Sequence, residues 1–191
     1  MNGQIYKPII FSAPMVQAIL EGRKTQTRRV VKQRGTPGEI LWVKETFKFN
    51  PGGPIYDAAG VIMDSMDDEL IYRADSPNLV TKWTPSIHMP RWASRITLGV
   101  TGIRMERLQD ISDEDAMAEG LKRMTKDGVL DKYGIPDADG MPGTDDMGWP
   151  WTKWDASPVT AYKKLWEKIH GPGSWDKNPL VWVIEFESVK L

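Results

Sequence analysis

The chain has 191 residues, a formal net charge of −1 and a pI near 6.2, so its length predicts one domain and its charge argues against a non-specific nucleic-acid coat protein, which is usually basic. It has no cysteine and two well-separated histidines, which excludes disulfides and thiolate chemistry, and we expect no metal and no cofactor. Because no apolar run approaches the ~20 residues that span a bilayer and the amino terminus lacks a signal pattern, we expect a cytoplasmic protein without membrane contact.

The first elements are a strand and a short helix. Residues 5–11 predict a strand, which Pro8 places at a sheet edge because proline cannot donate to a ladder. Ser12 can then cap a helix whose first turn tolerates Pro14 and whose apolar residues share one face. Gly22 is expected to end the helix in a left-handed conformation.

The segment after this helix is the most informative in the chain. Residues 21–29 read Glu-Gly-Arg-Lys-Thr-Gln-Thr-Arg-Arg, so two threonines alternate with basic side chains. Such a segment can bind an oxyanion, or activate a hydroxyl if one amine loses its proton. In a regular strand Lys24 and Thr27 lie on opposite faces, so they meet only if Lys24 lies in the turn. The alternative is a solvated basic edge strand.

The middle of the chain predicts strands joined by loops. Residues 39–47 alternate well enough for a strand, and we interpret Glu45 as a surface carboxylate near its end. Residues 50–60 are rich in proline and glycine and predict a loop, and residues 70–73 predict a short strand.

Residues 83–95 combine two prolines, two tryptophans and two arginines. The prolines forbid regular structure, yet tryptophan and arginine are costly to order without a partner surface. This segment can form the wall of a pocket in which Arg91 and Trp92 contact a planar ring. Alternatively the tryptophans close the end of the core and the arginines are solvated.

A long strand over residues 95–108 precedes a short capped helix. Ser112 and Asp115 have the spacing of a capping box, and Gly120 should end the helix just after Glu119. Glu119 thus lies at the carboxyl end of a helix, where the macrodipole disfavours negative charge and shifts a carboxyl towards its protonated form. An acid at this position requires an explanation.

The last third of the chain begins with a long connection. Residues 122–155 are rich in Gly, Asp and Pro and contain Trp149, Trp151 and Trp154, which indicates a functional loop such as a lid. Residues 157–171 predict a capped helix with an apolar stripe for the core, and residues 180–186 predict a central strand.

The motif Gly-x-Lys-Thr-x-Thr-x-Arg from Gly22 to Arg29 resembles that of the ASCH superfamily, whose members have a PUA-like β-barrel. Nearly the whole chain looks like the ASCH proteins of bacteriophages and prophages, through residues 21–25, 41–43, 72–75 and 86–95. The resemblance implies an α+β fold: a single domain over residues 1–191 with a mixed β-barrel, a few short helices, and long loop insertions at about 50–90 and 122–155.

The resemblance also implies an activity. Some small ASCH proteins are metal-free amidohydrolases that remove the acetyl group from N4-acetylcytidine with a Lys, a Thr and a distant Glu, which correspond here to Lys24, Thr27 and Glu119. In this hypothesis Lys24 has a lowered pKa and takes the proton of Thr27, which attacks the acetyl carbonyl. Glu119 protonates the leaving amine, and Arg29 or backbone amides hold the oxyanion.

Two other functions fit the same residues. PUA-like barrels commonly bind RNA, and the chain supplies basic and aromatic side chains for phosphate contacts and stacking. A third function is that of an ASCH-type ribonuclease, which without a metal would use the 2′-hydroxyl as nucleophile. The partner is then a modified nucleoside or RNA. The candidate binding residues for either are Arg23, Thr25, Arg28, Arg29, Arg91 and Trp92.

Overall fold

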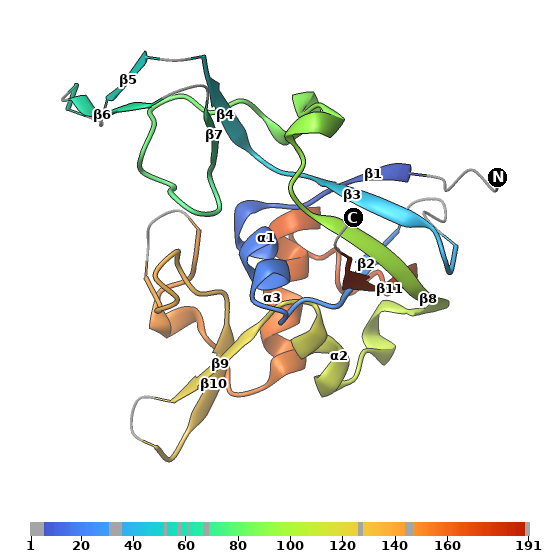
Figure 1. Ribbon diagram of the computed structural model, residues 1–191. Coiled ribbons are helices and arrows are strands. Elements are labelled where there is room, and N and C mark those ends of the chain that lie inside the picture. The colour runs from blue at the N-terminus through green and yellow to red at the C-terminus, as the bar shows by residue number, and fades with distance from the viewer. Residues whose placement is uncertain are drawn as a thin grey trace.

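The computed structural model describes residues 6–30, 36–51, 53–56, 59–60, 62–66, 69–125, 128–143 and 147–189. Across these residues the fold is α+β, with a mixed sheet against which the helices pack (Figure 1). The basic residues Lys32 and Arg34, and the predicted strand end at Val31, lie outside the described residues.

The main sheet has five strands in the order β1-β3-β8-β11-β2. β1 pairs with β3 in parallel, and the remaining neighbours are antiparallel. The sheet confirms that the first strand lies at an edge and that the last strand is central. The strands are β1 (Tyr6–Ile10), β2 (Gln26–Arg29), β3 (Ile40–Lys44), β8 (Thr97–Arg107) and β11 (Leu180–Ser188).

The central position of β11 follows from its sequence. Val181, Val183 and Ile184 are fully buried, as expected for a strand covered on both faces. β8 is long enough to pair with β3 through its first residues and with β11 along its whole length. β2, which carries the basic motif, is the second edge strand in the described sheet.

Three α-helices cover the core: α1 (Ala13–Leu20), α2 (Asp113–Ala118) and α3 (Pro158–His170). Two of the three predicted serine caps are confirmed, because Ser112 accepts from the Asp115 amide and Ser157 from the Thr160 amide, whereas Ser12 is the N-cap of α1 but makes no capping hydrogen bond with its side chain. One apolar cluster joins the inner face of the sheet to α1 and α3. Ile169 departs from the predicted stripe: it is 61% exposed, because it lies at the rim of two cavities.

Both predicted insertions contain regular structure. The loop prediction for residues 50–60 is wrong in part, since β4 (Phe47–Asn50) ends in this range and β5 (Gly53–Tyr56) lies within it; β4 pairs with β7 (Glu69–Tyr72), and β5 pairs with β6 (Ile62–Met66). These strands project from the main body at the upper left of Figure 1. The short strand predicted at residues 70–73 is confirmed within one residue at each end as β7.

The long connection at residues 122–155 is also not a loop throughout. It contains the hairpin of β9 (Lys122–Thr125) and β10 (Asp131–Gly134), and Trp149 and Trp154 belong to the main apolar cluster. Burial of the two indole rings fixes this segment to the body of the protein. Where it is described, the connection is therefore ordered, and its role as a lid stays a prediction.

Two side-chain predictions are also wrong. Glu45 is 1% exposed rather than at the surface, and the guanidinium of Arg95 donates to both of its oxygens at 2.9 and 3.0 Å. A buried carboxylate needs such a partner. Trp92 is 66% exposed and so does not close the core.

The remaining short elements are the 3-10 helices η1 (Ser86–His88), η2 (Arg91–Ala93), η3 (Leu108–Asp110) and η4 (Trp151–Lys153). In the described ranges, every helix is too short or too polar to cross a bilayer.

Candidate active site

The three predicted catalytic side chains, Lys24, Thr27 and Glu119, line one cavity of about 240 Å³. All three are buried, although they come from the turn before β2, from β2 itself and from the end of α2. The opposite wall is formed by α3 and by the chain that leaves β1. Residues 95 positions apart in sequence thus meet in one site.

The backbone places Lys24 in the turn before β2. This is the position that allows Lys24 and Thr27 to line the same cavity. α1 ends at Leu20 and is followed by Glu21 and then Gly22, which adopts φ 74°, and the amides of Arg23 and Lys24 both donate to the Ala18 carbonyl at 2.8 and 2.9 Å. Lys24 forms an isolated β-bridge with Glu119, and β2 begins only at Gln26. The irregular step removes the strict alternation that would separate Lys24 from Thr27.

Three acceptors surround the ammonium group of Lys24. Its Nζ donates to the Glu119 carboxylate at 2.8 Å, to the Glu119 carbonyl at 2.8 Å and to the Gln26 carbonyl at 2.9 Å. Burial lowers the pKa of Lys24 below its ordinary 10.5, and the negative charge of Glu119 opposes that effect without cancelling it. Positive charge on Arg29 and Arg28 lowers the same pKa further. The amine is therefore easier to deprotonate than a solvated lysine.

The position of Glu119 at a helix end is explained by two cations. Oε2 accepts from Lys24, and Oε1 accepts from Arg28 at 3.1 Å. These contacts offset the unfavourable helix dipole, so the resting site is built around a carboxylate. The chain can turn here because the next residue is Gly120, with φ 108°. A Cβ on Gly120 would lie 2.9 Å from the Ala18 Cβ.

Arg28 holds three acidic side chains together. Its guanidinium donates to Glu106 at 2.7 and 2.9 Å and to Asp115 at 2.6 Å, besides Glu119. Burial acts to lower the pKa of Arg28, but the surrounding carboxylates outweigh it and the pKa is raised. Arg104 joins the same network through Glu106 and Asp115. Arg28 lines the cavity, but its donors are used internally, so it positions Glu119.

Arg29 lies on the cavity wall where the two edge strands approach. Its Nη2 donates to the Ile10 carbonyl of β1 at 2.8 Å, and its guanidinium lies 5.4 Å from the centre of the Phe11 ring. Lys24 Nζ lies 5.6 Å from the same ring centre. An aromatic face next to two cations gives the cavity one flat, electron-rich wall.

Three site residues on α3 escaped the sequence analysis: Tyr162, Trp166 and His170. Burial, and then the charge of Glu119, raises the pKa of Tyr162 well above its ordinary value. The Trp166 indole nitrogen is buried without an acceptor in the described part of the chain. Burial and the charge of Arg29 lower the pKa of His170, whose ring lies 4.0 Å from that of Trp166.

The spacing of these residues was a usable signal. They recur every four positions, so they share one helix face, and each carries a polar atom that a purely apolar core would leave unpaired. We predicted the stripe as core from its apolar bulk alone.

Four other candidate residues do not line this cavity. Arg23 donates to Glu21 at 2.7 Å and to the Gly120 carbonyl, and the Thr25 side chain is exposed. Arg91 and Trp92 lie on η2, where Arg91 stacks over the rings of Tyr6 and Trp42. The structure thus separates the basic motif from the predicted stacking surface.

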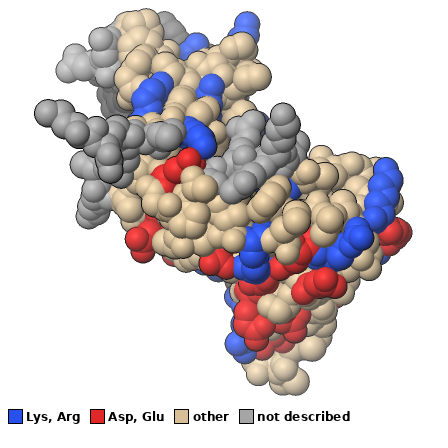
Figure 2. Space-filling view, turned by 90° about the vertical axis from the view of Figure 1, so that its right-hand side faces the viewer, with Lys and Arg blue, Asp and Glu red and all other residues tan. Residues whose placement is uncertain are grey.

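Acidic and basic side chains are mixed on one face of the protein. Figure 2 shows basic and acidic side chains interspersed across the lower half of the face that it presents. Within the described ranges, no group of three or more His, Cys, Asp or Glu side chains is arranged to hold a metal ion.

Comparison with known proteins adds no relative. The sequence matches no protein-family model, no curated protein and no solved structure. The assignment of a function therefore depends on the geometry of the site and on the motif.

Proposed function

We propose that the protein is a metal-free amidohydrolase of the ASCH type, with a PUA-like fold, that deacetylates N4-acetylcytidine or a related acylated nucleoside. The observation that carries the proposal is that Lys24, Thr27 and Glu119 line one cavity, with the Lys24 amine 2.8 Å from the Glu119 carboxylate. A nucleophile, a base and an acid are the groups that amide cleavage without a metal requires.

The 2.8 Å hydrogen bond between Lys24 and Glu119 couples the protonation states of the base and the acid. Transfer of one proton along this hydrogen bond turns the ammonium into an amine and the carboxylate into a carboxylic acid. Burial lowers the pKa of Lys24, which makes its amine form easier to reach. The same transfer therefore prepares Lys24 to accept a proton and Glu119 to give one.

In the first half-reaction the Thr27 oxygen attacks the acetyl carbonyl while Lys24 takes the hydroxyl proton. The negative charge that develops on the carbonyl oxygen is stabilised by Arg29 and by the N–H of Trp166. The bond from the carbonyl carbon to the exocyclic nitrogen then breaks, and Glu119 protonates the leaving amine. The acetyl group stays on Thr27 as an ester.

In the second half-reaction water cleaves this ester. The proton of water passes through the Lys24 and Glu119 pair, and the Thr27 oxygen recovers a proton as acetate leaves. The flat wall formed by Phe11, together with the rings on α3, offers apolar surface to a pyrimidine base. The net reaction consumes the amide and one water and yields cytidine and acetate.

RNA binding without catalysis has less support from the contacts. The RNA-binding hypothesis requires basic side chains that contact phosphates. However, Arg23 is paired with Glu21, and Arg28 is paired with three carboxylates. A guanidinium whose donors are engaged by carboxylates offers little to a phosphate. A ribonuclease using the 2′-hydroxyl would need the same Lys24 and Glu119 pair, and so remains the second candidate.

The test is incubation of the purified protein with N4-acetylcytidine and chromatographic detection of cytidine. Thr27→Val removes the nucleophile but leaves the ion pair of Lys24, so loss of cytidine formation would support the mechanism. Thr25→Val is the matched control, because Thr25 belongs to the same segment but lies outside the cavity. Equal turnover by Thr27→Val and the wild type would reject Thr27 as nucleophile. Cleavage of RNA but not of DNA, with no cytidine formed, would favour the ribonuclease.

A further inference from the structure

A second cavity of about 290 Å³ adjoins the candidate active site. The two cavities are bordered by the same side chains at the start of α1 and on α3, which are Ser12, Met15, Leu165 and Ile169. A ligand that fills the first cavity can therefore extend past this shared rim into the second.

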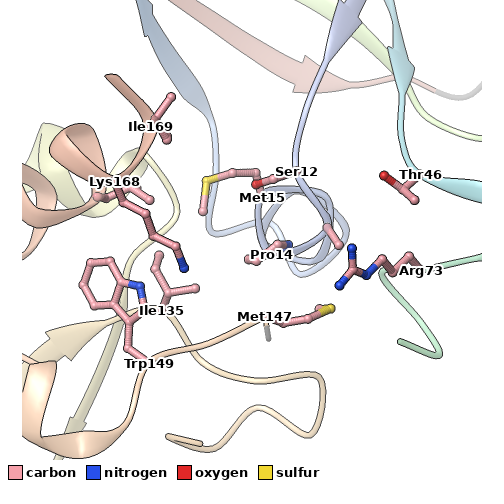
Figure 3. A pocket seen from close by; sticks show the side chains of 12 residues that line it. Ser12, Pro14, Met15, Thr46, Arg73, Ile135, Met147, Trp149, Lys168 and Ile169 are labelled. Atoms are coloured by element: carbon pink, nitrogen blue, oxygen red, sulfur yellow. The ribbon is translucent and has the colours of Figure 1, made fainter. Parts of the chain in front are cut away.

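Two cations face the second cavity from opposite sides. In Figure 3 the start of α1 is seen end-on, with Lys168 beside Trp149 on one side and Arg73 on the other. Neither side chain makes an ion pair with any residue that the structure describes. Two positive charges without counter-charge lining one hollow favour an anion between them.

Arg73 carries a second, independent sign of a missing ligand. Its Nε is buried and has no hydrogen-bond partner in the described part of the chain. Leaving a buried donor unpaired destabilises a protein, and more so when the donor is charged. The structure retains this cost at the edge of a cavity, where an acceptor from outside the protein could remove it.

The backbone and the remaining lining fit the same ligand. Ser12 is the N-cap of α1, yet its hydroxyl makes no capping hydrogen bond and lines the cavity. The amino end of a helix carries partial positive charge and is a recurrent phosphate-binding feature. Ile135, Met147 and Trp149 form the apolar remainder of the wall.

We infer that the second cavity binds the phosphate of a nucleoside monophosphate whose acylated base occupies the first cavity. The placement of the base rests on the proposed function, whereas the phosphate site rests on Arg73, Lys168 and Ser12. Arg73 and Lys168 match the dianionic charge of a phosphate monoester, and Ser12 donates a hydrogen bond. The substrate class is thereby narrowed from a free nucleoside to a nucleotide.

The test is isothermal titration calorimetry of the full chain with cytidine 5′-monophosphate, cytidine and the dinucleoside phosphate CpC. We expect the monophosphate to bind at least about tenfold more tightly than cytidine, since a charge-assisted contact contributes on the order of 1.4 kcal/mol or more. It should also bind more tightly than CpC, whose diester carries a single charge.

Arg73→Met and Lys168→Met should each remove most of this preference while leaving the affinity for cytidine unchanged. Lys163→Met is the matched control, because Lys163 lies on the same helix, pairs with Asp176 and lines neither cavity. Thermal unfolding of each variant verifies that the fold is retained.

The outcomes separate the phosphate site from the proposed chemistry. Equal affinity for cytidine and its monophosphate, or a preference that survives in both variants, overturns the phosphate site even if deacetylation is observed. Tighter binding of CpC than of the monophosphate also overturns it. Conversely, a phosphate preference that depends on Arg73 and Lys168 supports the site even if no acylated substrate is hydrolysed.

Discussion

The two adjoining cavities differ in whether their cationic side chains are paired with carboxylates. In the first, Lys24 and Arg28 are buried and each contacts carboxylates, so the positive charge is neutralised within the protein. In the second, Arg73 and Lys168 make no ion pair with any described residue. In the proposed function the run of basic residues supplies the acid-base groups, whereas the anion site that we infer is formed by two cations from distant segments.

The most severe test of the first cavity is Thr27→Val. If Thr27 is the nucleophile, kcat/KM for deacetylation should fall at least about 10³-fold, because the attacking hydroxyl is lost. The free energy of unfolding should change far less than for a cavity-creating substitution, because valine has nearly the shape of threonine and only the hydroxyl is replaced by a methyl group. Assays of wild type, Thr27→Val and Thr25→Val under one set of conditions measure the effect. A similar loss in both variants would point to a structural disturbance of the segment.

Arg28→Met tests whether the first network is held by charge pairing. Removal of the buried guanidinium leaves Glu106, Asp115 and Glu119 close together without their shared cation. Breaking a buried pair in this way should lower the free energy of unfolding by roughly 3–5 kcal/mol. Urea denaturation followed by tryptophan fluorescence measures it, with Arg107→Met as a control at the exposed end of β8. A loss below about 1 kcal/mol, the range of surface pairs, would contradict the account.

The pH dependence of activity tests the role of Lys24 as base. In the proposed mechanism the Lys24 and Glu119 pair must hold one proton, and it loses this proton as pH rises through the pKa of Lys24, which burial lowers from 10.5. Below that pKa kcat/KM should be level, and above it kcat/KM should fall about tenfold per pH unit, because Glu119 then has no proton to give the leaving amine. Lys24→Arg should be inactive at every pH, because a guanidinium stays protonated and cannot act as the base. Activity with the same falling limb in Lys24→Arg would assign the titration to another group.

The same pKa fixes the sign of the effect of Lys24 on stability. Between its folded pKa and 10.5 the unfolded chain binds more protons at this position than the native protein. The contribution of Lys24 to the free energy of unfolding therefore increases, and the protein becomes more stable, as pH rises through that interval. Acidification below the interval leaves the buried ammonium dependent on Glu119 and the two carbonyls.

Local chemistry made much of the fold predictable. The serine caps at Ser112 and Ser157, the glycine that ends α1 and the apolar run of β11 each specify structure through neighbours in sequence. The meeting of Lys24 with Glu119 was predicted from the motif and from an acid at an unfavourable helix end. Its geometry depends on the turn at Gly22, which sequence periodicity cannot position to within a residue.

The errors of prediction have a common cause in long-range contacts. Glu45 was placed at the surface because its partner Arg95 is 50 residues away in sequence. The hairpin of β9 and β10 was not predicted within the long connection, and the burial of Trp149 and Trp154 depends on a surface that comes from other segments. The second cavity was missed for the same reason, since Arg73 and Lys168 come from different parts of the chain.

The smallest expected effect is the change in the free energy of unfolding on substitution of Arg73, which lines the second cavity. We expect this change to have the opposite sign to that of Arg28→Met. Arg73→Met removes a buried donor that has no partner in the described residues and replaces it with an adaptable apolar side chain. Without ligand, the free energy of unfolding should stay constant or rise by up to about 1 kcal/mol. With cytidine 5′-monophosphate present, the wild type should gain stability in proportion to bound ligand, whereas the variant should gain less.

Urea denaturation with and without the nucleotide measures both quantities in one series. A loss of more than about 1 kcal/mol in the unliganded variant would show that Arg73 is held by the protein itself. The contrast between the two cavities would then disappear. If Arg73 serves to bind an external anion, its substitution should leave the unliganded protein equally or more stable, and the nucleotide should stabilise the variant less than the wild type. The reason is that the desolvation of Arg73 is offset only when the ligand binds.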